Sequence, residues 1–155
     1  MEITSKPNVL ELTNSECWQR MRELPFGRLA VVLDGRPEIF PVNHVVDRGS
    51  LVFRSDPGAK LLGAVGHAVA FEVDGYDDAS GVAWSVVAKG RAHEVRQLHE
   101  VIDTVALPLF PWQGGTKPRF VRIEVEQVTG RQFTRASQRG GGAAAAYSGS
   151  RTAEE

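Results

Sequence analysis

The sequence predicts a mainly β protein, a six-stranded antiparallel β-barrel with short helices. Two observations predict this fold. Two-residue turns join the first three apolar strand patterns, which leaves no room for the helical crossovers that parallel strands need. The chain has 155 residues, the usual size of one domain with one core. Because an open sheet exposes unpaired edges, we expect the sheet to close, with a flat α+β sheet as the alternative.

A short helix is expected near the N-terminus. Thr13 and Glu16 have the spacing of a capping box, in which each side chain bonds the backbone of the other residue. An apolar stripe at helical spacing follows, formed by Trp18, Met21 and Leu24. Pro25 and Gly27 then end the helix.

Strand patterns occupy most of the remaining chain. The six expected strands are residues 29–33, 37–47, 51–55, 68–73, 82–94 and 120–126. The dipeptides Asp34-Gly35 and Arg48-Gly49 are expected to form tight turns, and residues 74–81 a longer one. Two more short helices are expected, at 57–65 and 97–107.

The composition is that of an ordinary globular protein. A formal net charge of −1 gives no broad basic surface for nucleic acid. No apolar run approaches the ~20 residues that cross a bilayer, and the start lacks a secretory leader, so we expect neither membrane insertion nor secretion. Cys17 is the only cysteine, which excludes an internal disulfide and favours a reducing, cytoplasmic compartment. The domain is expected to span residues 1–135, followed by a flexible Gly/Ala-rich tail at 136–155.

Familiar catalytic signatures are missing from the sequence. It contains no nucleophile elbow, no Walker-type phosphate loop and no histidine pair at zinc spacing. Its histidines are scattered over the chain, at His44, His67, His93 and His99. We therefore predict no metal site and expect each histidine to be a surface or core-edge residue.

The most informative polar stretch follows the third expected strand. Arg54 and Ser55 end that strand, Pro57-Gly58 turns the chain, and Lys60 lies near the start of the next expected helix. A guanidinium fork, a hydroxyl, an ammonium group and exposed backbone N–H groups suit a monophosphate. The alternative is that Arg54 and Lys60 are solvated surface charges.

Five segments, in this order along the chain, resemble one family. They are Gly-Arg-Leu-Ala at 27–30, Pro-Glu-Ile-Phe-Pro-Val-Asn at 37–43, Phe-Arg-Ser at 53–55 with Gly-Ala-Lys at 58–60, Phe-Glu-Val-Asp at 71–74, and Trp-Ser-Val-Val-Ala-Lys-Gly-Arg-Ala at 84–92. The sequence resembles the pyridoxamine 5'-phosphate oxidase-like flavin proteins with the FMN-binding split-barrel fold. The likeness lies with their nitroimidazole-resistance-type reductase branch and covers about Leu12 to Arg131.

The resemblance implies where the cofactor binds. In such proteins the end of the third strand and the following turn grip the FMN phosphate, and the second strand lays its backbone along the flavin ring. The implied residues are Arg54, Ser55 and Lys60 for the phosphate, and Pro41, Val42 and Asn43 for the ring.

Other implied positions involve the start of the fifth strand and the subunit interface. Trp84 and Ser85 match positions that lie beside the flavin in relatives. The family is typically homodimeric, with two flavin sites between subunits, so Trp112 is expected to reach the partner's cofactor. Without the family, Trp84 on an alternating strand is a core or interface aromatic.

The implied function is that of an FMN-dependent oxidoreductase acting on a small organic substrate, with hydride transfer through flavin N5. A nitro compound or quinone is the favoured acceptor, because the chain lacks the basic C-terminal pattern of true pyridoxamine phosphate oxidases. Three alternatives remain: a deazaflavin coenzyme on the same fold, a flavin carrier or sensor without turnover, and a haem protein with His44 or His67 as ligand. No catalytic acid or base is identified.

Overall fold

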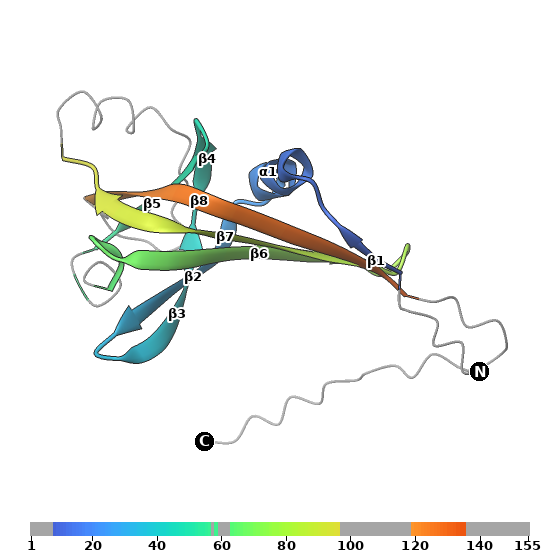
Figure 1. The fold of residues 1–155 in the computed structure, drawn as a ribbon, viewed down its shortest axis with the longest axis horizontal. Coiled ribbons are helices and arrows are strands. Elements are labelled where there is room, and N and C mark those ends of the chain that lie inside the picture. Colours follow the sequence, from blue (N-terminus) through green and yellow to red (C-terminus); the bar gives the residue numbers. More distant parts are fainter. Residues whose placement is uncertain (1–7, 57, 59–62, 97–118, 136–155) are drawn as a thin grey trace, which may run out of the picture.

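The computed structural model describes residues 8–56, 58, 63–96 and 119–135, and it is built almost entirely from strands (Figure 1). The elements are β1 (Asn8–Glu11), α1 (Asn14–Glu23), β2 (Phe26–Leu33), β3 (Arg36–Asn43), β4 (Val45–Asp47), β5 (Ser50–Ser55), β6 (Ala68–Asp77), β7 (Val82–Glu94) and β8 (Arg119–Thr134). The helices expected at 57–65 and 97–107 lie partly or wholly outside the described residues, as does the expected tail at 136–155.

The described strands form one antiparallel sheet with the order β3-β2-β6-β7-β8-β5-β4, and β1 pairs with β8. The long strands β6, β7 and β8 run the length of the molecule, while the sheet curls so that β4 and the β2–β3 hairpin lie on opposite sides of them (Figure 1). The prediction of a mainly β, split-barrel fold is confirmed.

The strand count of six is wrong, because seven described strands follow this order and β1 adds another. The expected strand at 37–47 is divided at His44, between β3 and β4. The backbone N–H of His44 donates to the carbonyl oxygen of Pro25 at 3.0 Å instead of extending the ladder. The extra strand β1 is only four residues long and all four are exposed, so it has no buried face to mark it in the sequence.

Both tight turns are confirmed. Asp34 and Gly35 have φ values of 53° and 72°, and Arg48 and Gly49 have φ values of 48° and 71°. Two successive left-handed residues define the type I′ turn, whose twist matches that of the strands it joins. These turns set the registers Leu33↔Arg36 and Asp47↔Ser50.

Two strands extend beyond the expected ends. The strand expected at 68–73 continues to Asp77, so residues 74–77 are not part of a turn, and the strand expected at 120–126 continues to Thr134. The added residues pair with β7, through Asp77↔Val82 and Val82↔Thr134. Cross-strand pairing overrides the weak strand preference of Asp and Gly at these positions.

Helix α1 begins as predicted. The Thr13 hydroxyl accepts a hydrogen bond from the Glu16 backbone N–H at 3.2 Å, and the Glu16 carboxylate accepts one from the Thr13 N–H at 3.4 Å. The side chains of Cys17 and Met21, both in α1, are fully buried. A Cβ at Gly130 would lie 2.7 Å from the Cys17 sulfur, so a glycine in β8 permits this close approach.

The core lies between α1 and the concave side of the sheet. Its largest fully buried side chains include Phe53, Phe71, Met21 and Leu29, from β5, β6, α1 and β2. Elements far apart in the sequence therefore share one core, as expected for a domain of this size. Within the described ranges, no helix has the length and apolar character to cross a membrane.

Candidate functional site

Two of the regions predicted to bind a cofactor approach each other where the sheet curls. Strand β4 pairs with β5 from Val45↔Val52 to Asp47↔Ser50, and the chain leaves this ladder at His44. Strands β3 and β5 are in contact although they lie far apart in the strand order. The curl thus brings the predicted ring strand β3 and the predicted phosphate strand β5 together.

The end of β5 is positioned by its pairing with β8. Arg54 pairs with Phe120, and its guanidinium carbon lies 5.2 Å from the centre of the Phe120 ring, a cation–π contact. Ser55 is buried, and its hydroxyl donates a hydrogen bond to the Asp56 carbonyl oxygen at 2.9 Å. Because a serine has one hydroxyl proton, that donor is already engaged. Lys60 lies outside the described residues.

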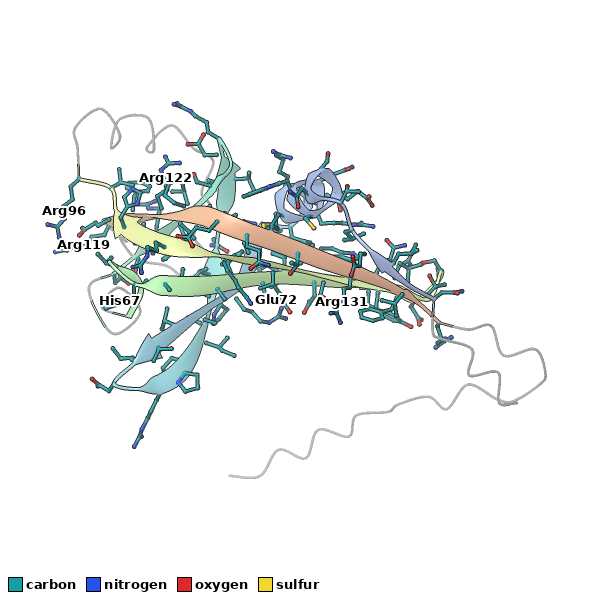
Figure 2. The ribbon with its side chains drawn as sticks, in the orientation of Figure 1. His67, Glu72, Arg96, Arg119, Arg122 and Arg131 are labelled. Atoms are coloured by element: carbon teal, nitrogen blue, oxygen red, sulfur yellow. The ribbon has the colours of Figure 1, made fainter. Side chains whose placement is uncertain are left out.

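Further guanidinium groups gather at this end of the long strands (Figure 2). Arg119 pairs with Ser55 in the sheet and donates to the Glu94 carboxylate at 3.2 Å. Arg96 donates to the same carboxylate at 2.8 Å. Glu94 holds both arginines and offsets part of their charge, which leaves a net positive charge near the end of β5, where Arg119 pairs with Ser55.

The predicted ring strand lies at an edge of the sheet. In the described residues β3 pairs only with β2, through Phe26↔Asn43, Gly27↔Val42 and Arg28↔Pro41. Pro41, which lacks an N–H, suits an edge strand. Val42 is buried in the core, whereas Asn43 is half-buried beside a pocket.

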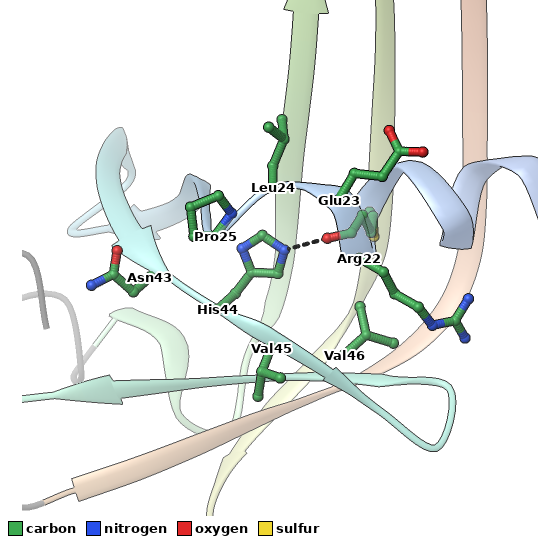
Figure 3. Close-up of a pocket in the computed structure, with 9 residues that line it drawn as sticks. Arg22, Glu23, Leu24, Pro25, Asn43, His44, Val45 and Val46 are labelled. Carbon is green, nitrogen blue, oxygen red and sulfur yellow. Dashed lines mark hydrogen bonds between the residues drawn. The ribbon is translucent and has the colours of Figure 1, made fainter. Parts of the chain in front are cut away.

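That pocket lies between the end of α1 and the junction of β3 with β4, and has a volume of about 350 Å³ (Figure 3). Most of its lining is apolar, with a few polar side chains. The lining residues are Met21, Arg22, Glu23, Leu24, Pro25, Asn43, His44, Val45 and Val46. Small-molecule sites have volumes of about 300–1,000 Å³ and this mixture of apolar and polar groups.

His44, which the sequence analysis considered only as an ordinary histidine or a haem ligand, is buried beside this pocket. It is 5% exposed, and its ring packs edge-on against Phe71 with 4.8 Å between ring centres. Nε2 lies 2.8 Å from the Met21 carbonyl oxygen, at the end of α1 (Figure 3). Burial lowers the pKa of His44, which keeps the ring neutral. His44 directly follows the Pro-Val-Asn segment, and this position was the one signal in the sequence that could have placed it beside the pocket.

The residues predicted at the start of the fifth strand lie elsewhere. Trp84 and Ser85 are neighbours in β7 and therefore point to opposite faces of the sheet. Trp84 packs on the α1 side, 4.9 Å below the Arg20 guanidinium. On β8, the partners of Trp84 and Arg54 are Gln132 and Phe120, twelve residues apart. At ~3.3 Å per residue, roughly 40 Å of strand separates the two regions. Trp112 lies outside the described residues.

An ion-pair cluster occupies the outer face of β2 and β6. The Arg28 guanidinium contacts Glu72 at 3.0 Å and Asp74 at 3.1 Å. Partial burial and the neighbouring Asp74 raise the pKa of Glu72. Asp74, followed by Glu72, raises the pKa of Arg28. All three side chains are about one third to one half exposed, so the cluster joins two strands without forming a cavity.

The two histidines considered as haem ligands differ in accessibility. A backbone carbonyl can only accept, so Nε2 of His44 carries a proton and donates it to Met21. That nitrogen is not available to a metal. His67 is exposed. Among the described residues, no three His, Cys, Asp or Glu side chains gather into a group that could hold a metal ion.

Comparison with known proteins defines the class. The family described as pyridoxamine 5'-phosphate oxidase matches residues 13–132, and the chain belongs to this family. An uncharacterized protein of Mycobacterium tuberculosis is 35% identical over 81% of this chain and 86% of its own length.

Solved structures show the same fold. A candidate pyridoxamine 5'-phosphate oxidase of Corynebacterium glutamicum has a TM-score of 0.76 and 37% identity, covering 87% of this chain and 99% of that one. The FAD-binding protein of Mycobacterium smegmatis has a TM-score of 0.71 and 32% identity, covering 81% and 98%. A candidate 5-nitroimidazole antibiotic resistance protein of Bacteroides thetaiotaomicron shares the fold alone, at 13% identity and a TM-score of 0.69 over 83% and 90%.

Proposed function

We propose that this protein binds a flavin nucleotide where β3, β4 and β5 meet and acts as a flavin-dependent oxidoreductase. The observation that carries the proposal is the contact between β3 and β5, together with the pocket that Asn43 of β3 lines. Family membership and the FAD-binding relative support a flavin as the ligand. The pocket's apolar lining and its polar edge suit a flat ring with hydrogen-bonding groups on one side.

The phosphate is assigned to the end of β5. Arg54 supplies a fixed guanidinium, and Arg119 and Arg96 add positive charge at the same end. The Ser55 hydroxyl would bind the phosphate by replacing its hydrogen bond to the Asp56 carbonyl oxygen with one to a phosphate oxygen. Lys60 is also assigned to the phosphate, on the basis of the sequence alone. FMN is our predicted cofactor, and FAD shares the phosphate that these residues would bind.

The flavin ring is assigned to strand β3. The backbone of Pro41, Val42 and Asn43 would run along it, with Asn43 lining the pocket. When bound, the flavin supplies hydride transfer at N5. The chain's own task is to orient the ring, bind the phosphate and leave room for a small organic acceptor such as a nitro compound or quinone.

A homodimer accounts for the distant residues. The β8 partners of Arg54 and Trp84 are separated by roughly 40 Å of strand, so the phosphate assigned to Arg54 lies far from Trp84 of the same chain. We therefore assign Trp84 or Ser85, whichever lies beside the flavin as the family resemblance implies, to the partner subunit. We assign Trp112 to the same interface. Because Trp84 and Ser85 face opposite sides of the sheet, only one of them can contact a given ring.

The test is a parallel titration of the purified protein with riboflavin, FMN, FAD and a deazaflavin coenzyme, followed by flavin fluorescence. Saturable binding of FMN or FAD, with a weaker response to riboflavin, supports the site. A response to the deazaflavin alone would overturn the flavin assignment. Anaerobic addition of NADH or NADPH then tests turnover, because bound flavin that no donor reduces would indicate a carrier. A Soret band on addition of haem would favour the haem alternative.

A further inference from the structure

One side of the sheet faces away from the core. Side chains alternate along a strand, and residues paired directly across antiparallel strands share a face. On β6, Val69, Phe71 and Val73 are buried in the core, so the residues between them lie on the opposite side of the sheet. We call that side the outer face. On the strands that the structure describes, it carries two exposed apolar patches.

The distal patch is a row across β6, β7, β8 and β1, at the end of β6 that lies away from the β2–β3 hairpin. Its members are Tyr76, Ala83, Phe133 and Val9, each paired with the next. Tyr76 is 58% exposed, Phe133 39% and Val9 41%. Large apolar side chains that lie side by side on a surface mark an interaction site.

The hairpin patch lies on β2 and β3. Val32 is 62% exposed and Ile39 is 67% exposed. Ile39 pairs with Ala30, which in turn pairs with Ala70 of β6, so this patch is also on the outer face. Ala70 and Tyr76 are six residues apart on β6, which separates the two patches by roughly 20 Å.

A charged strip lies between the two patches (Figure 2). It consists of two rows of paired residues. The row next to the hairpin patch is Pro41, Arg28 and Glu72, and the row next to the distal patch is Asp74, Ser85, Arg131 and Glu11. Both signs of charge are present, so the strip can face a copy of itself with opposite charges in contact.

We propose that a second copy of this chain covers the outer face, related to the first by a two-fold axis through the charged strip. Such an axis exchanges the two ends of the face, so the distal patch of each copy packs on the hairpin patch of the other. Apolar surface then meets apolar surface at both ends, with the charges between them. The inference rests on the proposed function, which takes the protein to be a homodimer with its flavin between the subunits.

The size of the outer face suits such a dimer. It extends from β3 across β2, β6, β7 and β8 to β1, and from Ala68 to Tyr76 along β6. With strands about 4.8 Å apart and a rise of about 3.3 Å per residue, it is roughly 25 Å in each direction. Its projected area of about 600 Å², enlarged by the relief of the side chains, is close to the ~800 Å² that each partner buries in an interface of standard size. A single bound peptide would leave one patch uncovered.

The same arrangement selects the residue that the partner brings to the flavin. When the distal row of one copy packs on Ile39 of the other, the next row inward lies opposite the row of Pro41, on the strand assigned to the ring. That inward row contains Ser85. Trp84 lies on the other side of the sheet, under the Arg20 guanidinium. The partner's Ser85, and not Trp84, therefore lies beside the flavin ring.

The first experiment measures the oligomeric state without flavin, by sedimentation equilibrium. We expect the natural chain to be a dimer at micromolar concentration. Ile39→Lys and Phe133→Lys, one in each patch, should each raise the dimer dissociation constant at least about 10-fold, because a buried lysine would have no partner. The control is Leu10→Lys, since Leu10 is 60% exposed but pairs with Gln132 on the other side of the sheet. It should stay within about 2-fold of the natural chain. A monomeric natural chain, or equal dissociation by the control, would overturn the interface.

The second experiment tests the exchange of ends. Chains carrying Ile39→Cys and Phe133→Cys are co-expressed and treated with a short bis-maleimide, and the natural Cys17 is fully buried. We expect a crosslinked pair with one chain of each kind, and little crosslinking when either chain is expressed alone. Crosslinking of the Ile39→Cys chain to itself would place β3 against β3 and overturn the two-fold arrangement. Absence of the mixed product would overturn it too.

The third experiment locates the flavin. Ser85→Leu should weaken FMN binding about 10-fold, while Gln132→Leu, at the β8 partner of Trp84, should change it by less than about 2-fold. The reverse result would place the flavin on the Trp84 side and overturn the choice of Ser85. A monomeric chain that binds FMN would refute this interface and leave flavin binding intact. A stable dimer that binds neither FMN nor FAD would overturn the proposed function and leave the interface.

Discussion

The indole ring of Trp84 lies directly on the backbone of Gly75, its cross-strand partner in β6. A Cβ built on Gly75 would stand 2.7 Å from two atoms of that ring, closer than real side chains approach. The Arg20 guanidinium covers the ring from α1. The glycine thus determines how the helix and sheet hold this tryptophan.

Gly75→Ala should therefore displace Trp84. We expect a loss of about 1–3 kcal/mol in the free energy of unfolding, the usual cost of overpacking, together with a shift in tryptophan fluorescence. Urea unfolding measures the first quantity. Gly58→Ala is the matched control, because no described residue lies within 4 Å of a Cβ at that position, and it should change stability by less than about 0.5 kcal/mol. Equal effects of the two substitutions would refute the contact.

Stability should fall as the pH drops below about 6.5, because of His44. Burial lowers its pKa in the folded protein, so the unfolded chain binds more protons between the folded and unfolded pKa values. In that window the free energy of unfolding decreases with falling pH, by at most about 1.4 kcal/mol per pH unit. Above the window, His44 is neutral in both states and this contribution is complete.

Urea midpoints at about pH 7.5, 6 and 5 measure the effect. His44→Phe should flatten the slope, whatever its own stability, while His67→Phe should retain it. Glu72, whose pKa is raised, acts in the opposite direction, since protonating it favours the folded state. Its contribution is common to all three proteins and cancels in the comparison. An unchanged slope in His44→Phe would show that another group controls the transition.

Arg28→Gln should be more harmful than Glu72→Gln. The first change leaves Glu72 and Asp74 together without their shared cation, while the second relieves the repulsion between them. Since the three side chains are about one third to one half exposed, we expect a loss of only ~0.5–1 kcal/mol for Arg28→Gln and little change for Glu72→Gln. Roughly 1 M salt should reduce the difference, as measured by urea unfolding. A difference that salt leaves unchanged would point to lost packing of the Arg28 stem instead.

Arg54→Ala combined with Lys60→Ala should weaken FMN binding far more than riboflavin binding. The phosphate loses charge-assisted hydrogen bonds, which are worth about 1.5–3 kcal/mol each, whereas riboflavin has no phosphate to lose. Fluorescence titration gives both dissociation constants. Arg48→Ala, at an exposed arginine in the β4–β5 turn, serves as the control for the loss of a surface charge outside the site. A similar loss for both ligands would place the phosphate elsewhere.

Local chemistry was readable from the sequence. The capping box at Thr13 and the left-handed turns at Asp34-Gly35 and Arg48-Gly49 formed as predicted, because each depends on a few neighbouring residues. Strand β7 has the predicted bounds, Val82 to Glu94. The family segments identified the fold, which is confirmed.

What the sequence alone determined is therefore the set of local elements and the class of fold. Only the tertiary structure decided which distant residues meet: β3 contacts β5, while the β8 partners of Arg54 and Trp84 are twelve residues apart. His44 had no distinctive local pattern. Its surroundings are the Phe71 ring and the Met21 carbonyl oxygen, which lie 27 and 23 residues away from it in the sequence. The physical reason is that hydrogen-bond partners and burial come from the curl of the sheet, which is a property of the whole core rather than of any one segment.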